Sequence, residues 1–143
     1  MSVSARNVFA GKITALAQGT VNAEVAVSLS GNDKIVAIVT ADSVKHLGLA
    51  IGQAVVAYVK APWVMLVNAV PEVHFSARNQ LTGTVSKVHK GAVNSEVSLL
   101  LPGGSTVFAV ATHEAVLELG LKEGAAATAL IKASDVVLGV SAA

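Results

Sequence analysis

The sequence reads SARNVFAGKITALAQGTVNAEVAVS over residues 4–28 and SARNQLTGTVSKVHKGAVNSEVSLL over residues 76–100. Both stretches open with the same four residues, and a shift of 72 positions carries the match on without a gap until residues 68 and 140. An internal repeat of this kind indicates a duplicated structural unit. Some charged residues recur at equivalent positions in both copies: the only two arginines, Arg6 and Arg78, are partners under the shift.

The repeat predicts two modules, residues 1–68 and 76–143, joined by a linker at residues 69–75. Units this small bury only about 60% of the surface that their unfolded chains expose. The composition is unusual for such units, since 53% of the residues are hydrophobic and 13% are charged, against about 25% charged in ordinary soluble domains. We therefore expect much of the apolar surface to lie in interfaces, between the halves and between subunits.

Composition also argues against several classes of protein. A membrane-spanning helix needs about 20 consecutive apolar residues, and here Lys60 ends one apolar run while Pro102 and two glycines split another. The absence of cysteine excludes disulfides and thiolate metal sites, and no secretory signal is expected, so the expected location is cytoplasmic. The net charge is +1 and the basic residues are scattered, which is not the pattern of a nucleic-acid-binding surface.

The fold class follows from the pattern of strands. Alternation from Val21 to Leu29 is typical of a half-buried strand, Gly31-Asn32-Asp33 is a turn signal, and Thr40 is the expected N-cap of a helix that ends near Gly48. Five strands are expected in the first module, at Asn7–Leu16, Val21–Leu29, Lys34–Val39, Ala54–Val59 and Val64–Val67. Repeated in the second module, this order predicts an all-β protein of two tandem OB-like five-stranded barrels, each with one short helix.

Several polar residues recur in both copies. Arg6 offers a planar set of donors, Lys60 offers a point charge, and a helix that begins at Thr40 presents free backbone N–H groups. A set that contains only donors suits a small oxyanion. The alternative is purely structural: a threonine at an N-cap can be only a cap, the lysine can be solvated, and Arg6 can pair with Glu24. The residues by themselves leave both interpretations open.

The combined motifs resemble the molbindin, or Mop, domain. They are Ser-Ala-Arg-Asn followed by Gly11, the string Gly-x-Val-Asn-x-Glu-Val from Gly19, the string Leu-Gly-Leu-x-x-Gly from Leu47, and Lys-Ala-Pro-Trp-Val from Lys60. The resemblance covers nearly the whole chain, twice, and is closest to the two-module molbindins. It implies an OB-like barrel per module, a homotrimer, and molybdate or tungstate held in pockets where modules meet.

The resemblance also implies site residues. The first type of molybdate pocket would use the following residues and backbone groups: Ser4, Arg6, Thr40, Ser43, Lys60, Ala61, Ser76, Arg78, Thr112, Lys132, Ala133 and Ser134. A second type of site would use the turns at Gly19, Val21 and Asn22 and at Gly91, Val93 and Asn94. The copies differ at one predicted ligand, because Ala115 stands where Ser43 does, and we expect the lost donor to separate the two pockets in affinity.

These observations predict a non-enzymatic, cytoplasmic protein that binds molybdate, and tungstate as a competitor, for storage and homeostasis, with no catalytic cofactor and no metal cation. One alternative is a molybdate-sensing module that regulates a separate partner protein. The other is an OB-type nucleic-acid binder, which the few aromatic residues disfavour. The four histidines are expected on the surface or in packing, and Trp63 in an interface. We expect no nucleic-acid or membrane partner.

Overall fold

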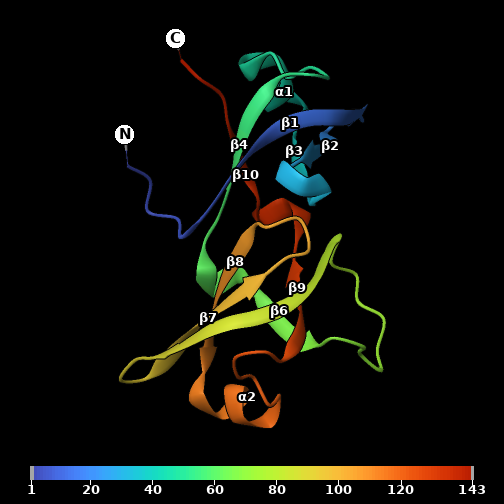
Figure 1. Ribbon diagram of the computed structural model, residues 1–143. Helices are drawn as coiled ribbons and strands as arrows, with labels where there is room; N and C mark the ends of the chain where they lie inside the picture. Colours follow the sequence, from blue (N-terminus) through green and yellow to red (C-terminus); the bar gives the residue numbers. More distant parts are fainter. Residues whose placement is uncertain (1, 143) are drawn as a thin grey trace.

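The computed structural model describes residues 2–142 as two β lobes stacked end to end (Figure 1). The upper lobe holds a sheet in the order β10-β4-β1-β2-β3, and the lower lobe a sheet in the order β5-β9-β6-β7-β8. The single α-helices of the two halves lie at opposite ends of the molecule (Figure 1). The predicted fold class, two tandem five-stranded barrels with one short helix each, is confirmed.

The bounds of the elements follow the repeat. The first half forms β1 (Asn7–Gln18), β2 (Asn22–Ser28), η1 (Ser30–Asn32), β3 (Lys34–Thr40), α1 (Ala41–Leu47), β4 (Ala54–Val59), η2 (Ala61–Trp63) and β5 (Met65–Asn68). The second half forms β6 (Asn79–Lys90), β7 (Asn94–Leu100), β8 (Thr106–Thr112), α2 (His113–Glu118), β9 (Ala126–Ile131), η3 (Ala133–Asp135) and β10 (Val137–Gly139). The elements η1, η2 and η3 are short 3-10 turns.

Local chemistry explains these elements. Along β2 every second side chain is buried, including Ala23, Val25 and Val27, because successive side chains of a strand point to opposite faces. The predicted alternation fails only at its start, where Val21 belongs to a turn and is 73% exposed. Helix α1 begins where the Thr40 hydroxyl accepts a hydrogen bond from the Ser43 N–H, and it ends at Gly48 in the left-handed conformation, as the sequence predicts.

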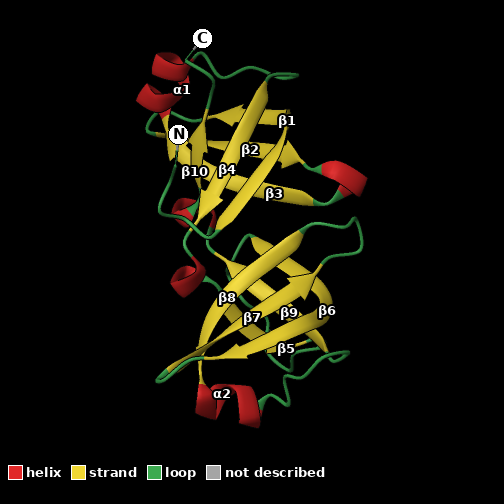
Figure 2. Ribbon diagram, turned by 60° about the vertical axis from the view of Figure 1, so that its left-hand side comes forward, coloured by secondary structure: helices red, strands yellow, loops and turns green. Residues whose placement is uncertain are grey.

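The fifth strand of each sheet comes from the other half of the chain. Strand β10 pairs with β4 in the upper lobe, and β5 pairs with β9 in the lower lobe; Figure 2 labels β5 among the lower strands. The repeat did not predict this exchange, since residues 64–67 were expected to complete the module that contains them. Each sheet therefore contains strands from both predicted modules. The division into modules at residues 1–68 and 76–143, with a linker at residues 69–75, stays a prediction.

Two buried asparagines fasten the lobes together. The Asn7 side chain donates to the carbonyl oxygen of Phe108 at 2.8 Å and accepts from the Phe108 N–H at 2.7 Å. Asn79 makes the equivalent pair of bonds with Val36, at 2.8 and 2.7 Å. Each amide thus satisfies the backbone of an edge strand of the opposite lobe. The pairs fix the start of β1 and of β6, and with them the segments that carry Ser4 and Ser76.

Candidate functional site

Two cavities of the structure are related to each other by the repeat. The first, of about 360 Å³, is lined by Val3, Ser4, Ala5, Tyr58, Lys60, Trp63 and Val137. The second, of about 280 Å³, is lined by Trp63, Met65, Phe75, Ser76, Ala77, Leu130, Lys132 and Asp135. We call them the Lys60 cavity and the Lys132 cavity. Every wall residue of the Lys60 cavity has its repeat partner in the Lys132 cavity, and Trp63 borders both cavities.

Strand register brings the predicted ligands Ser4 and Lys60 together. Asn7 lies opposite Val59 in the antiparallel pair of β1 and β4, so the residues before Asn7 run beside the residues after Val59. The same register, Asn79 opposite Ile131, brings Ser76 to Lys132. Lys60 and Lys132 also occupy the N-cap positions of η2 and η3. Four residues predicted as anion ligands thereby line two equivalent cavities, and their role as ligands stays a prediction.

The exchanged strands complete both cavities. Val137 of β10 lies opposite Tyr58 and lines the Lys60 cavity. Met65 of β5 lies opposite Leu130 and lines the Lys132 cavity. Each cavity is therefore built from both halves of the chain. The resemblance implied pockets where modules meet, but not the exchange of strands that builds these cavities. The walls are mostly apolar around one serine and one lysine in each cavity, with Asp135 as an additional charged residue in the Lys132 cavity. A water molecule occupies only about 30 Å³, so each cavity has room for a small hydrated anion.

The arginines of the repeat are engaged elsewhere. Arg6 donates to Glu96 at 3.1 Å, and its guanidinium lies 3.7 Å from the centre of the Phe108 ring. Arg78 pairs with Glu24 in the same crosswise manner. Of the two interpretations of Arg6, the structure shows pairing, with the acid of the other copy rather than with Glu24. Neither arginine lines the Lys60 or the Lys132 cavity, and their role as anion ligands stays a prediction.

The remaining first-type residues lie outside the two cavities as well. The Thr40 and Ser43 hydroxyls are 2.8 Å apart at the start of α1. Thr112 accepts from the Ala115 N–H at 3.1 Å at the start of α2, with no hydroxyl at position 115. Ala61 and Ala133 are buried at the first position of η2 and η3, and Ser134 is exposed. Within one chain, therefore, the predicted donors do not all meet: some line the two cavities, and others lie at the helix caps.

The two turns predicted as second-type sites are closed by equivalent backbone hydrogen bonds. The Gly19 N–H donates to the Asn22 carbonyl at 2.8 Å, and the Gly91 N–H donates to the Asn94 carbonyl at 2.8 Å. Their tips expose Val21 and Val93, at 73% and 76%. The assignment of Gly19, Val21, Asn22, Gly91, Val93 and Asn94 to a second-type site stays a prediction.

His113 ties the second of these turns to α2. Its Nε2 lies 3.0 Å from the Gly91 carbonyl oxygen and its Nδ1 2.9 Å from the Ser95 hydroxyl. Because a carbonyl oxygen can only accept, the ring carries a proton on Nε2. The repeat partner of His113 is Ala41, so only the second copy has this brace, in agreement with the expected packing role of the histidines.

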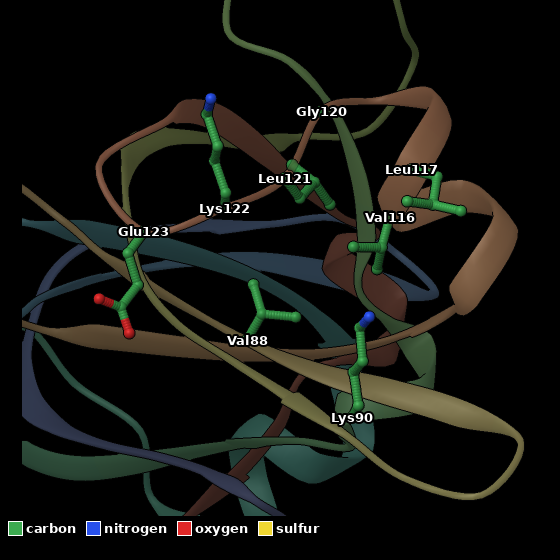
Figure 3. Close-up of a pocket in the computed structure, with 8 residues that line it drawn as sticks. All are labelled: Val88, Lys90, Val116, Leu117, Gly120, Leu121, Lys122 and Glu123. Carbon is green, nitrogen blue, oxygen red and sulfur yellow. The ribbon is translucent and has the colours of Figure 1, made fainter.

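The second half also contains a larger apolar cavity, of about 650 Å³, between α2 and β6. Figure 3 shows the side chains of Val88, Val116 and Leu121 pointing toward one another at its centre. Lys90, Lys122 and Glu123 also line it. The sequence did not predict this cavity, because no recurring polar residue marks it.

Residues 2–142 contain no group of three or more His, Cys, Asp or Glu residues that could hold a metal ion. Within the same residues, neither α1 nor α2 nor any 3-10 turn is long and apolar enough to cross a membrane.

The fold and the paired cavities define a tandem-repeat β-barrel protein with one equivalent cavity per repeat. The chain matches the TOBE domain over residues 3–66 and again over residues 76–138, and it belongs to this family. The resemblance to Mop domains that the motifs indicated is confirmed.

Relatives and solved structures give the same picture. The chain is similar to the molybdenum transport protein ModE of Azotobacter vinelandii, with 46% identity over 98% of this chain and 52% of that protein. It is 40% identical to the molybdenum-pterin-binding protein MopA of Rhodobacter capsulatus, over 98% of this chain and 53% of that protein. The chain thus spans about half the length of these curated relatives. The crystal structure of the cytoplasmic molybdate-binding protein ModG, with molybdate bound, superposes with a TM-score of 0.93 at 55% identity, covering 99% and 100% of the two chains.

Proposed function

We propose that this chain binds molybdate, with tungstate as a competitor, and that it stores or buffers the anion in the cytoplasm without catalysing a reaction. The observation that carries the proposal is the duplicated cavity, in which Ser4 and Lys60, and again Ser76 and Lys132, converge. Molybdate is a dianion whose oxygens accept hydrogen bonds on every side, and these groups donate. Similarity to ModG along the whole of both chains supports the same ligand.

Neutralisation rather than chemistry is the proposed mechanism. An ammonium group meets the dianion in an enclosure with apolar walls, where the attraction between charges is stronger than in water. Hydroxyls and backbone N–H groups satisfy the other oxygens. Thr40 with Ser43, and Thr112, would complete these donor sets if the helix caps of one chain meet the cavities of another in the proposed homotrimer. Exposed Val137, Met65 and Trp63, at 58%, 61% and 46%, are apolar surface for such contacts.

The alternative of a molybdate-sensing module that regulates a separate partner protein is less favoured, since the chain is similar to the molybdate-binding protein ModG along the whole of both chains. Such a role would use the same anion site and add a separate partner. Pull-down with and without molybdate separates the two roles. Partner capture that depends on the anion would favour sensing, and capture that is absent in both conditions would favour storage.

Calorimetric titration with molybdate in excess sulfate tests the anion site. We expect saturable binding by the native chain and affinity at least about tenfold weaker after Lys60→Ala combined with Lys132→Ala, because each change removes a hydrogen bond to a charged group. The matched control, Lys12→Ala with Lys34→Ala, removes the same net charge from exposed positions outside both cavities. Equal weakening in both double variants, or no binding by the native chain, would contradict the proposal.

A further inference from the structure

The Lys60 and Lys132 cavities differ in one charged residue. Trp63 is the third residue of η2, and its repeat partner in η3 is Asp135. Trp63 lines both cavities, whereas Asp135 lines only the Lys132 cavity. One of two otherwise equivalent sites therefore has a carboxylate in its wall, and the other has none.

The carboxylate of Asp135 is not neutralised by a neighbour. The described residues, 2–142, form two ion pairs, Arg6 with Glu96 and Arg78 with Glu24, and Asp135 takes part in neither. Its contact with Lys132 is between backbones, where the Asp135 N–H donates to the Lys132 carbonyl at 3.0 Å. The Lys132 ammonium and the Asp135 carboxylate form no ion pair with each other, and both residues line the cavity.

We infer that Asp135 is an affinity-determining residue that makes the Lys132 cavity the weaker of two classes of oxyanion site. This inference rests on the proposed function and assigns a difference within it. A dianion that enters beside Lys132 meets one opposite charge and one like charge, whereas beside Lys60 it meets only the opposite charge. The Lys60 cavity then fills at low anion concentration, and the Lys132 cavity fills only at higher concentration, which widens the range over which the protein buffers the anion.

A poorly anchored backbone at the Lys132 cavity does not explain weaker binding there. The Gln80 amide donates to the carbonyls of Phe75 and Ala77 at 3.1 Å each, and so holds the segment that carries Ser76. The equivalent position in the first half is Val8, which is 54% exposed and has no polar side chain. The backbone of the Lys132 cavity is thus the better anchored of the two, and the carboxylate acts against that advantage.

The missing hydroxyl at Ala115 is a competing cause that can be tested separately. Ala115 is the repeat partner of Ser43, and neither residue lines the two cavities of a single chain. If the lost donor alone sets the difference, Ala115→Ser would strengthen the weak class and Asp135→Asn would not. If Asp135 sets it, the order of effects is reversed.

Titrations of single-cavity variants with molybdate test the inference. Lys60→Ala leaves the Lys132 cavity, and in this background Asp135→Asn should tighten binding about tenfold, because it removes a like charge without changing side-chain shape. The gain in affinity from Asp135→Asn should be smaller in the Lys132→Ala background, because the intact Lys60 cavity is not lined by Asp135. Glu72→Gln is the matched control, since Glu72 is exposed, lines neither cavity and gives the same change in net charge.

The outcomes separate the inference from the proposed function. A tenfold gain confined to Asp135→Asn in the Lys60→Ala background supports the inference. Binding that responds equally to Asp135→Asn and Glu72→Gln, or that responds only to Ala115→Ser, overturns it while leaving molybdate binding in place. Absence of molybdate binding by the native chain overturns both.

Discussion

Replacement of Asn79 by alanine is expected to lower the free energy of unfolding by about 2–5 kcal/mol. The Asn79 side chain is 3% exposed and makes three hydrogen bonds, two with the backbone of Val36 and one to the carbonyl of Ile131 at 3.2 Å. Alanine cannot replace these bonds, and each polar group left without a partner away from water costs about 1–3 kcal/mol. The loss should appear in urea denaturation at a fixed protein concentration.

Asn68→Ala is the control for this substitution. Asn68 lies at the exposed end of β5, and surface changes of this kind usually stay within about 0.5 kcal/mol. Hydrogen exchange at the Val36 amide adds a local readout, since that N–H donates to Asn79 across the lobes. An Asn79→Ala variant as stable as Asn68→Ala, or one with an unchanged Val36 exchange rate, would contradict the described fastening of the lobes.

The strength of sequence-based prediction in this chain lies in local patterns. Alternation from Ala23 to Val27 and the Thr40 cap are set by neighbouring residues, and the structure has both where they were expected. Ser4 and Lys60, which were predicted to share one anion site, line the same cavity, although their role as ligands stays a prediction. Their meeting depends only on the antiparallel register of β1 and β4, which any barrel built from these strands would share.

Duplication itself hides the remaining contacts. Residues 65–67 and 137–139 are repeat partners, and Leu66 and Leu138 are identical, so the repeat does not indicate which strand completes which sheet. The arginine–glutamate pairs present the same ambiguity, since the two arginines and the glutamates at positions 24 and 96 all recur under the repeat, and the repeat does not indicate that Arg6 meets Glu96. Which copy meets which depends on the path of residues 69–78, and that path is not encoded in any local periodicity.

The candidate site was predictable only in part for a related reason. Recurrence identifies Ser4, Lys60, Thr40 and Arg6 as a set, but it carries no information about distance. In one chain the structure places the first two in a cavity, the third at a helix cap and the fourth in an ion pair. Asp135 was missed because recurrence selects what the copies share, and this residue matters through what they do not share.

Replacement of Gly31 by alanine is expected to cost about 2–5 kcal/mol of unfolding free energy, from two separate terms. Gly31 has a φ of 70°, a left-handed conformation that costs a residue with a Cβ about 1–2 kcal/mol. A Cβ at this position would also lie 2.6 Å from the Cα of Gly103 in the opposite lobe and would press on its carbonyl oxygen. Backbone atoms cannot rotate away as a side chain can, so the two turns must separate.

Gly48→Ala isolates the conformational term. Gly48 has a φ of 62°, and a Cβ there would meet no atom within 4 Å, so only the cost of about 1–2 kcal/mol should remain. The difference between the two variants, measured by the same urea denaturation, is the cost of separating the turns at Gly31 and Gly103. Separation also strains the bonds from the Gly103 and Ser105 N–H groups to Asp33, at 2.9 and 3.2 Å. Equal losses in the two variants would mean that the turns do not touch in solution, and the lobes would then be held by the asparagine pairs and the exchanged strands.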